Sequence, residues 1–165
     1  MYMQRTFAIF ILAVALATLS TALIAEHFFD KEPCPFCLYQ RIPFLLTGFL
    51  AIIILFLRRP STLTPHIFML CGLIYLSGSG LAIYHVGLER LWWSSECSGS
   101  LSQNVTLEEL RASLMQKAER SCDDVNWSIF GVSLATYNVF FSSILSLTSV
   151  VISQRILKKL MEKTE

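Results

Sequence analysis

Two cysteines separated by two residues begin the segment with the clearest capacity for chemistry. Cys34 and Cys37 belong to the run PCPFCLYQR at residues 33–41, and a long apolar stretch follows. If that stretch is a helix, Cys34 can cap it and Pro35 takes its first position, where the missing N–H costs nothing. Cys37 then lies in the first turn, where the helix dipole and the free N–H groups stabilise a thiolate. The motif predicts a reactive dithiol at the start of a helix.

One cation follows the dithiol on the same helix face. Arg41 comes four residues after Cys37, so its guanidinium is expected to support a thiolate there. Pro43 removes the hydrogen bond to the Tyr39 carbonyl and predicts a kink just after the motif. The alternative interpretation of the two cysteines is a structural disulfide or an inert metal-binding pair.

Four long apolar runs set the fold class. Hydrophobic residues make up 54% of the 165 residues, which is too high for an ordinary soluble domain of this length. The excess lies at about residues 7–25, 38–57, 66–86 and 129–152, and a bilayer core needs about 20 residues. We therefore predict one domain, residues 1–165, of the all-α membrane class: a four-helix transmembrane bundle. A signal peptide is the alternative interpretation of residues 7–25.

The charges predict how this bundle is oriented. The two ends of the chain and the turn near Arg58 carry seven Lys and Arg against two acids, a net charge of +5. The two other loops, about residues 26–37 and 87–128, together with Arg41 just after the first of them, carry six against ten, a net charge of −4, and the two sums give the total of +1. Basic flanks stay in the cytoplasm. Both termini are therefore expected to be cytoplasmic, and a net charge of +1 gives no support for nucleic-acid binding.

This orientation separates the five cysteines. The outer loops hold four of them, where disulfides persist: Cys34, Cys37, Cys97 and Cys122. Cys71 lies inside the third span, and we expect it to act as a small hydrophobic residue. In the same span, Gly78 and Ala82 form a small-xxx-small pair that predicts close helix packing.

The second outer loop is expected to contain a short amphipathic helix. Thr106 and Glu109 match a capping box, and an apolar face follows at Leu107, Leu110, Leu114 and Ala118. That helix could lie in the membrane interface, with Trp92, Trp93 and Trp127 at headgroup level. Packing against the bundle is an equally good interpretation.

Among the polar residues near the outer ends of the spans, His85 is a candidate site residue. His85 could face the dithiol from the third span and donate a hydrogen bond to a carbonyl ligand, or it could simply pair with Glu89 four residues later. Asn138 in the fourth span is expected to bridge helices. A metal site at His85 and the cysteines is disfavoured, because a long loop separates Cys97 from Cys122 where zinc sites use closely spaced pairs. We predict no metal.

Taken together, these segments resemble the disulfide-bond-formation protein B (DsbB) family of bacterial inner-membrane, quinone-dependent thiol oxidases. The matching segments are CPFCLYQR (34–41), YHVGLE (84–89), CSG (97–99), CDDVNW (122–127) and GVSLA (131–135). They occur in the family's order and cover nearly the whole chain. Small departures at Phe36, Leu88 and Tyr137 leave the chemistry intact.

The resemblance implies a role for each cysteine. Cys97 and Cys122 would form the disulfide that a periplasmic, DsbA-like thioredoxin-fold oxidase attacks, and Cys97 would be the sulfur attacked. Freed Cys122 would attack Cys34, and Cys37 would leave as a thiolate and pass electrons to a quinone held by Arg41 and His85. A relay of this kind, from a DsbA-like oxidase through its membrane partner to a quinone, keeps the bacterial periplasm oxidising.

The expected activity is therefore a protein-dithiol:quinone oxidoreductase, in the bacterial inner membrane, that sustains disulfide formation. Ubiquinone is the expected acceptor and menaquinone the alternative. Two other functions stay open from the residues alone. One is another membrane thiol-redox enzyme, such as a vitamin-K-epoxide-reductase-like protein or a paralogue with a dedicated partner. The other is a non-enzymatic four-span protein whose disulfides only brace its loops.

Overall fold

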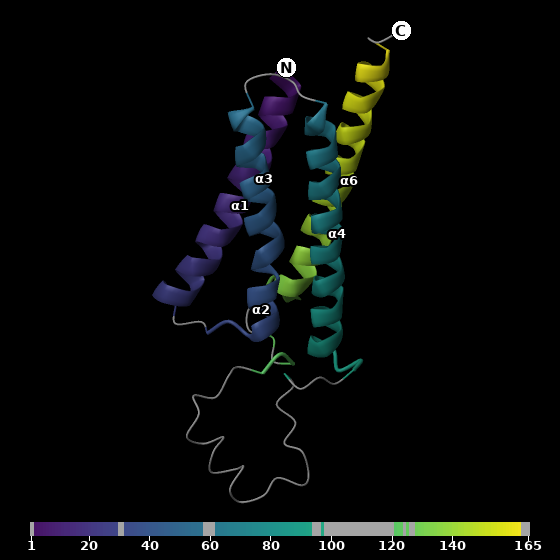
Figure 1. Cartoon of the computed structure of the whole chain (residues 1–165). Coiled ribbons are helices and arrows are strands. Elements are labelled where there is room, and N and C mark those ends of the chain that lie inside the picture. Colours follow the sequence, from purple (N-terminus) through teal and green to yellow (C-terminus); the bar gives the residue numbers. More distant parts are fainter. Residues whose placement is uncertain are drawn as a thin grey trace, which may run out of the picture.

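Four long helices form the body of the described part of the protein (Figure 1). The structure is a computed structural model, and it describes residues 2–29, 32–57, 62–93, 97, 121–123, 125 and 128–162. Its elements are α1 (Tyr2–Phe28), α2 (Pro35–Tyr39), α3 (Arg41–Phe56), α4 (Leu63–Glu89), β1 (Ser128–Ile129), β2 (Val132–Ser133) and α6 (Leu134–Met161). Four helical segments in the described part of the chain are long and apolar enough to cross a membrane, with α2 and α3 forming one of them. The predicted four-helix transmembrane bundle is confirmed.

The second span is broken where the sequence predicts a kink. α2 ends at Tyr39 and α3 starts at Arg41, with Gln40 between them. Pro43 accounts for the break, because its ring lacks an N–H and crowds the carbonyl of residue 39. The dithiol therefore sits on a short helical segment of its own, directly before the main part of the span.

The fourth span begins later than expected. Helix α6 starts at Leu134, whereas the apolar run suggested a start near residue 129. Residues 128–133 form a small antiparallel hairpin instead, and Phe130 and Gly131 take positive φ angles of 52° and 78° at its turn. The hydroxyl of Ser133 then accepts the N–H of Thr136 at 3.2 Å and caps the helix.

Small and hydroxylated residues let α4 and α6 pack closely. Ser146 donates to the Gly72 carbonyl at 2.8 Å, and Ser153 donates to the Pro65 carbonyl at 2.6 Å. A side chain at Gly72 would meet Val150 at 2.7 Å, so only glycine allows this approach. Such contacts are typical of helix pairs in membranes, where apolar burial gives no driving force.

The α3–α4 contact confirms the packing predicted for the third span. A side chain at Gly78 would approach Pro43 to 3.0 Å, and Ala82 is fully buried. Cys71 is also fully buried, in a cluster with Ile11 and Phe68, which confirms its expected behaviour as a small hydrophobic residue.

Helix α1 packs along α3, and its Phe28 end lies apart from α4 and α6 (Figure 1). The outward faces of the bundle are apolar, with Phe49, Phe140 and Leu147 each more than half exposed. An exposed apolar belt of this kind suits contact with lipid. The start of α1 and the end of α6 lie at the same end of the bundle, opposite α2.

Several expectations fall outside the described residues. They are the amphipathic helix at residues 107–118, the interfacial placement of Trp127 and the basic turn at Arg58. Trp93 is described, and it packs on the end of α4: its ring stacks on Tyr84, and its indole N–H donates to the Tyr84 carbonyl at 3.1 Å.

Candidate active site

The dithiol is built on the first turn of α2, as the motif predicts. Cys34 is the N-cap of this helix and Pro35 follows in the first turn. The Cys34 sulfur accepts the backbone N–H of Cys37 at 3.2 Å. This capping contact turns the Cys34 side chain back over the helix start, so that both cysteines face the same place.

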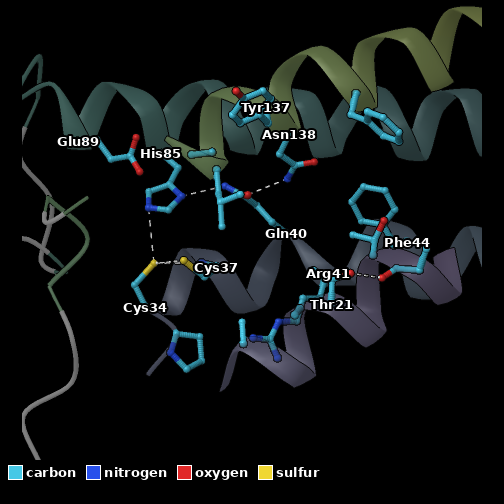
Figure 2. Close-up of a pocket in the computed structure, with 18 residues that line it drawn as sticks. Thr21, Cys34, Cys37, Gln40, Arg41, Phe44, His85, Glu89, Tyr137 and Asn138 are labelled. Carbon is cyan, nitrogen blue, oxygen red and sulfur yellow. Dashed lines mark hydrogen bonds between the residues drawn. The ribbon is translucent and has the colours of Figure 1, made fainter. Parts of the chain in front are cut away.

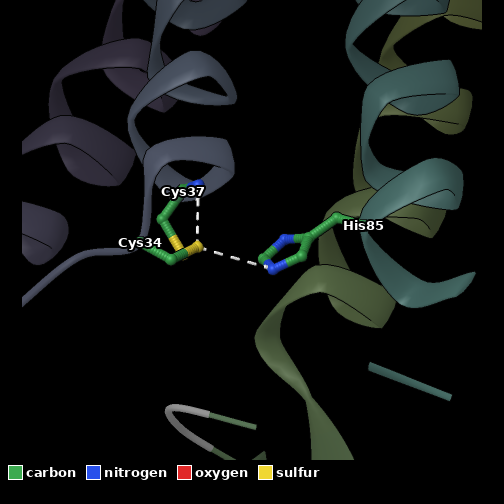
Figure 3. Close-up of side chains that lie close together, drawn as sticks. All are labelled: Cys34, Cys37 and His85. Atoms are coloured by element: carbon green, nitrogen blue, oxygen red, sulfur yellow. Dashed lines mark hydrogen bonds between the residues drawn. The ribbon is translucent and has the colours of Figure 1, made fainter. Parts of the chain in front are cut away.

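Histidine 85 of α4 completes a compact group with the two thiols (Figure 3). The Cys34 and Cys37 sulfurs are 2.7 Å apart, and the His85 Nε2 lies 3.5 Å from the Cys34 sulfur. Cys34 is 2% exposed and His85 is 4% exposed, whereas Cys37 is half-buried. The structure thus brings His85 to the dithiol, and its ring contacts Cys34 and Gln40 rather than pairing with Glu89.

These contacts favour a thiolate at Cys34. The hydrogen bond from the Cys37 side chain lowers the pKa of the Cys34 thiol well below its usual value, and His85 lowers it further, against the opposing effect of burial. We expected the thiolate at Cys37, in the first turn of the helix. The reason for the difference is that Cys34, as the capping residue, is the sulfur that receives the donors.

Arg41 lies near the dithiol but its contact is with another helix. Its guanidinium donates to the Glu26 carboxylate of α1 at 2.9 Å, and both side chains are partly exposed. The expected support of a cysteine thiolate by Arg41 is therefore replaced, in this arrangement, by an ion pair that links α1 to the start of α3. Arg41 still lines the cavity described below.

The second cysteine pair lies against the first. Cys97 and Cys122 form a disulfide with their Cα atoms 5.4 Å apart, and the Cys122 N–H donates to the Cys97 carbonyl at 2.9 Å. Cys122 is fully buried in one cluster with Cys34 and Leu88, and Cys37 and Cys97 pack against that cluster. These four cysteines therefore meet at one end of the bundle.

A cavity of about 460 Å³ opens beside the dithiol, among α1, α2, α3, α4 and α6 (Figure 2). Its lining is mostly apolar, and includes Ala17, Ala22, Phe44, Leu134 and Phe141. The polar side chains that reach its wall are Thr18, Thr21, Gln40, Arg41, His85, Glu89, Tyr137 and Asn138. An apolar cavity with a few convergent polar groups is the usual form of a small-molecule site.

One arrangement in the site resembles a metal-ligand set. Single ligand atoms of Cys34, Cys37 and His85 lie within 4.8 Å of one another. Thiolate and imidazole ligands suit soft cations, but structural zinc sites use four ligands, and only these three group together among the described residues. The absence of a metal remains our prediction.

Sequence reasoning missed two residues of the site. Gln40 bonds to His85 and to Asn138, and a polar residue inside an apolar span was a signal that could have singled it out. Glu26 pairs with Arg41, which comes 15 positions later in the sequence. The only signal for this pair was an acidic residue at the end of one span followed by a basic residue at the start of the next span. Asn138 bridges α6 to Gln40, as expected of an interhelical contact, and also faces the cavity.

The fold and the site define a class: a multi-pass membrane protein that carries a disulfide packed against a second dithiol. The family model described as "Disulfide bond formation protein DsbB" matches residues 4–152. The chain belongs to the DsbB family, and it is a disulfide-forming membrane protein.

Curated relatives agree with this assignment. A protein named "Disulfide bond formation protein B" from Acinetobacter baylyi is 32% identical over 135 residues, covering 78% of each chain. One of the same name from Marinobacter nauticus is 28% identical over 153 residues, covering 86% of this chain and 87% of the relative. An uncharacterized Rickettsia prowazekii protein is 28% identical over 136 residues, covering 80% of this chain and 77% of the relative.

Proposed function

We propose that this protein is a thiol:quinone oxidoreductase of the bacterial inner membrane, which reoxidises a periplasmic DsbA-like dithiol protein and so sustains disulfide formation. The observation that carries the proposal is the contact between the two cysteine pairs: Cys122 and Cys34 share one buried cluster beside an apolar cavity. Two disulfides that only braced loops would need neither this contact nor a cavity next to the thiols.

The proposed orientation places the dithiol end in the periplasm and both termini in the cytoplasm. Arg5, Arg155, Lys158 and Lys159 belong to the helix ends opposite α2. Basic residues at that end are retained in the cytoplasm, so the cysteines face the compartment where disulfides persist.

The first exchange takes place at Cys97. A thiolate of the reduced partner attacks the Cys97 sulfur, the Cys97–Cys122 bond breaks, and Cys122 leaves with the electron pair. Access supports this choice of sulfur, because Cys97 is half-buried while Cys122 is fully buried. The partner's second thiolate then displaces Cys97, so that the partner carries a disulfide and the two electrons rest on Cys97 and Cys122.

The second exchange moves those electrons to the dithiol. The Cys122 thiolate attacks Cys34 of an oxidised Cys34–Cys37 pair, and Cys37 leaves as a thiolate. Cys97 then attacks Cys122, which restores the outer disulfide and releases Cys34. The stabilisation of negative charge on Cys34, which gives its thiol a lowered pKa beside Cys37 and His85, makes Cys34 a good leaving group in this last step.

The residues around the cavity fit a quinone. Apolar walls from α1, α3 and α6 suit a ring with a lipid-soluble tail, and we assign Arg41 as a donor to one of its carbonyl oxygens. His85 lines the same cavity with its Nε2 facing the Cys34 sulfur. A quinone bound there would accept the two electrons released when the Cys34–Cys37 disulfide forms, together with the proton of the Cys37 thiol and one proton from water, because Cys34 is already a thiolate. The chain's own part is to hold Cys37 at the cavity wall and to keep water from the thiolates by burying Cys34.

Oxidation of a reduced DsbA-like protein tests this proposal. With ubiquinone present, catalytic amounts of this protein should oxidise many equivalents of partner, counted by the loss of free thiols. Without a quinone, oxidation should stop after the disulfides of the protein are used. Continued oxidation at the same rate without any quinone would contradict the proposed acceptor, and no oxidation at all would favour a structural role for the cysteines.

A further inference from the structure

A chain of side-chain hydrogen bonds runs from Ser142 of α6 to the dithiol, and Figure 2 shows the part of it from Asn138 through Gln40 and His85 to Cys34. Ser142 donates to the Asn138 Oδ1 at 2.9 Å, and the Asn138 Nδ2 donates to the Gln40 Oε1 at 2.7 Å. The Gln40 Nε2 lies 2.9 Å from the His85 Nδ1, and the His85 Nε2 lies 3.5 Å from the Cys34 sulfur. Ser142, Gln40 and His85 are buried, so water competes little for these three groups, whereas Asn138 is part-buried at the cavity wall.

The hydrogen bonds of this chain all run in one direction, and that direction determines which imidazole nitrogen of His85 carries the proton. A primary amide accepts at its oxygen and donates at its nitrogen. Since the Gln40 oxygen is used by Asn138, the Gln40 nitrogen faces His85, and Nδ1 must be the acceptor. The ring proton is therefore on Nε2, which is the nitrogen that faces Cys34.

We propose that Gln40 and Asn138 are positioning residues, whose amides hold His85 as the Nε2–H tautomer and aim that N–H at the Cys34 sulfur. Asn138 reaches Cys34 only through Gln40 and His85. A reversed chain would put the proton on Nδ1 and turn a bare Nε2 toward the sulfur, which would favour the thiol over the thiolate.

The two other histidines provide an internal contrast. The Nδ1 atoms of His27 and His66 lie 3.1 Å and 2.9 Å from the carbonyl oxygens of Leu23 and Thr62. A carbonyl can only accept, so these two rings carry the proton on Nδ1 in those contacts. His85 is expected to be the opposite tautomer, because its Nδ1 faces an amide nitrogen.

Several ionisable groups surround the Cys34 sulfur and His85. They are Cys37 on α2, Arg41 on α3 with its partner Glu26 on α1, Glu89 on α4 and Tyr137 on α6. The Cys37 thiol is the largest contributor to the lowered pKa of Cys34, and His85 adds to it. Loss of this hydrogen-bond chain should therefore raise the Cys34 pKa only part of the way toward that of a free cysteine.

The inference rests on the proposed function only in treating the reduced dithiol as a working state. Its test needs neither partner nor quinone, so a failure of the proposed function would leave this inference standing, and a failure of this inference would leave the proposed function standing. The full-length reduced protein in detergent is labelled with 15N-histidine and 13Cβ-cysteine. The tautomer of His85 is read from its two nitrogen shifts, and the Cys34 ionisation from its carbon shift against pH.

Wild-type protein should show His85 with the proton on Nε2. Gln40→Leu and Asn138→Leu should each move the Cys34 midpoint upward by about one pH unit, a tenfold change in its ionisation constant. The double variant should have the same Cys34 midpoint as Gln40→Leu alone, because the two substitutions interrupt the same hydrogen-bond chain. Gln40→Glu keeps an acceptor for Asn138 and stabilises a proton on both ring nitrogens, so its midpoint should stay at or below that of wild type.

Ser143→Ala is the matched control, since Ser143 bonds to Ser79 and to the Val139 carbonyl on α6 but lies outside the chain. It should leave the Cys34 midpoint unchanged. The proposal is overturned if His85 carries its proton on Nδ1 in the reduced wild type, or if both leucine variants keep the wild-type midpoint. If the leucine variants do not fold, the wild-type tautomer and the Gln40→Glu midpoint decide.

Discussion

Replacing Cys34 with serine should convert a catalyst into a reagent that acts once. The Cys97–Cys122 disulfide remains in this variant, and the half-buried Cys97 stays open to attack. A reduced DsbA-like partner can therefore lose at most one pair of electrons to each protein molecule. The electrons then have no path onward, because Cys122 has no sulfur to attack at position 34. Counting the partner disulfides formed per protein molecule, with quinone in excess, measures this limit.

Two matched variants make the result specific. Cys122→Ser removes the outer disulfide itself, so it should oxidise no partner. Cys71→Ser removes a cysteine buried on α4 among Ala8, Ile11 and Phe68, and it should turn over like wild type if it folds. Repeated turnover by Cys34→Ser would contradict the relay, because it would mean that electrons leave Cys97 and Cys122 by another route.

Replacing Arg41 with leucine should weaken quinone binding far more than it slows the exchange between cysteines. Among the described residues, Arg41 is the one Lys or Arg side chain in the cavity lining, which also contains Cys37. A hydrogen bond from a charged group contributes about 1.5–3 kcal/mol, which corresponds to a rise of about tenfold to a hundredfold in the KM for quinone. The rate at saturating quinone should change little by comparison.

The Glu26 ion pair requires its own control. Arg41→Leu leaves the Glu26 carboxylate of α1 without the partner it has in wild type, which could displace α1 from the cavity wall. The double variant Glu26→Gln, Arg41→Leu removes both charges and should keep the high KM. A return to the wild-type KM would assign Arg41 to holding α1 and not to binding quinone. Arg90→Leu makes the same charge change at the C-cap of α4, outside the cavity lining, and should have no effect.

Local rules were enough to predict much of this site. An N-cap cysteine followed by proline fixes the start of α2, and Pro43 breaks the span where its ring crowds Tyr39. Runs of about 20 apolar residues fix the number of spans. A cysteine deep in such a run, Cys71, has no polar surroundings to react with. Each of these conclusions depends on residues within one turn or one span of one another.

Contacts between distant elements were not predictable in the same way. Gln40 meets His85 across 45 positions and Asn138 across 98, and nothing local selects these partners. The preference for a thiolate at Cys34 also depends on a residue of another helix, His85. Helix α6 starts at Leu134 because Gly131 allows the preceding turn and Ser133 caps the helix. The sequence suggested an earlier start because residues 129–130 are hydrophobic.

Quinone reduction by the purified protein shows directly whether electrons pass from the partner through the cysteines to a quinone. Reduced DsbA-like partner and ubiquinone are mixed with wild type, Cys37→Ser or Cys71→Ser, and the loss of the quinone absorbance is followed. We expect sustained reduction by wild type and Cys71→Ser, and none by Cys37→Ser, because Cys37 is the thiol at the cavity wall that must close the disulfide with Cys34. Quinone reduction by Cys37→Ser at the wild-type rate would contradict the proposed relay.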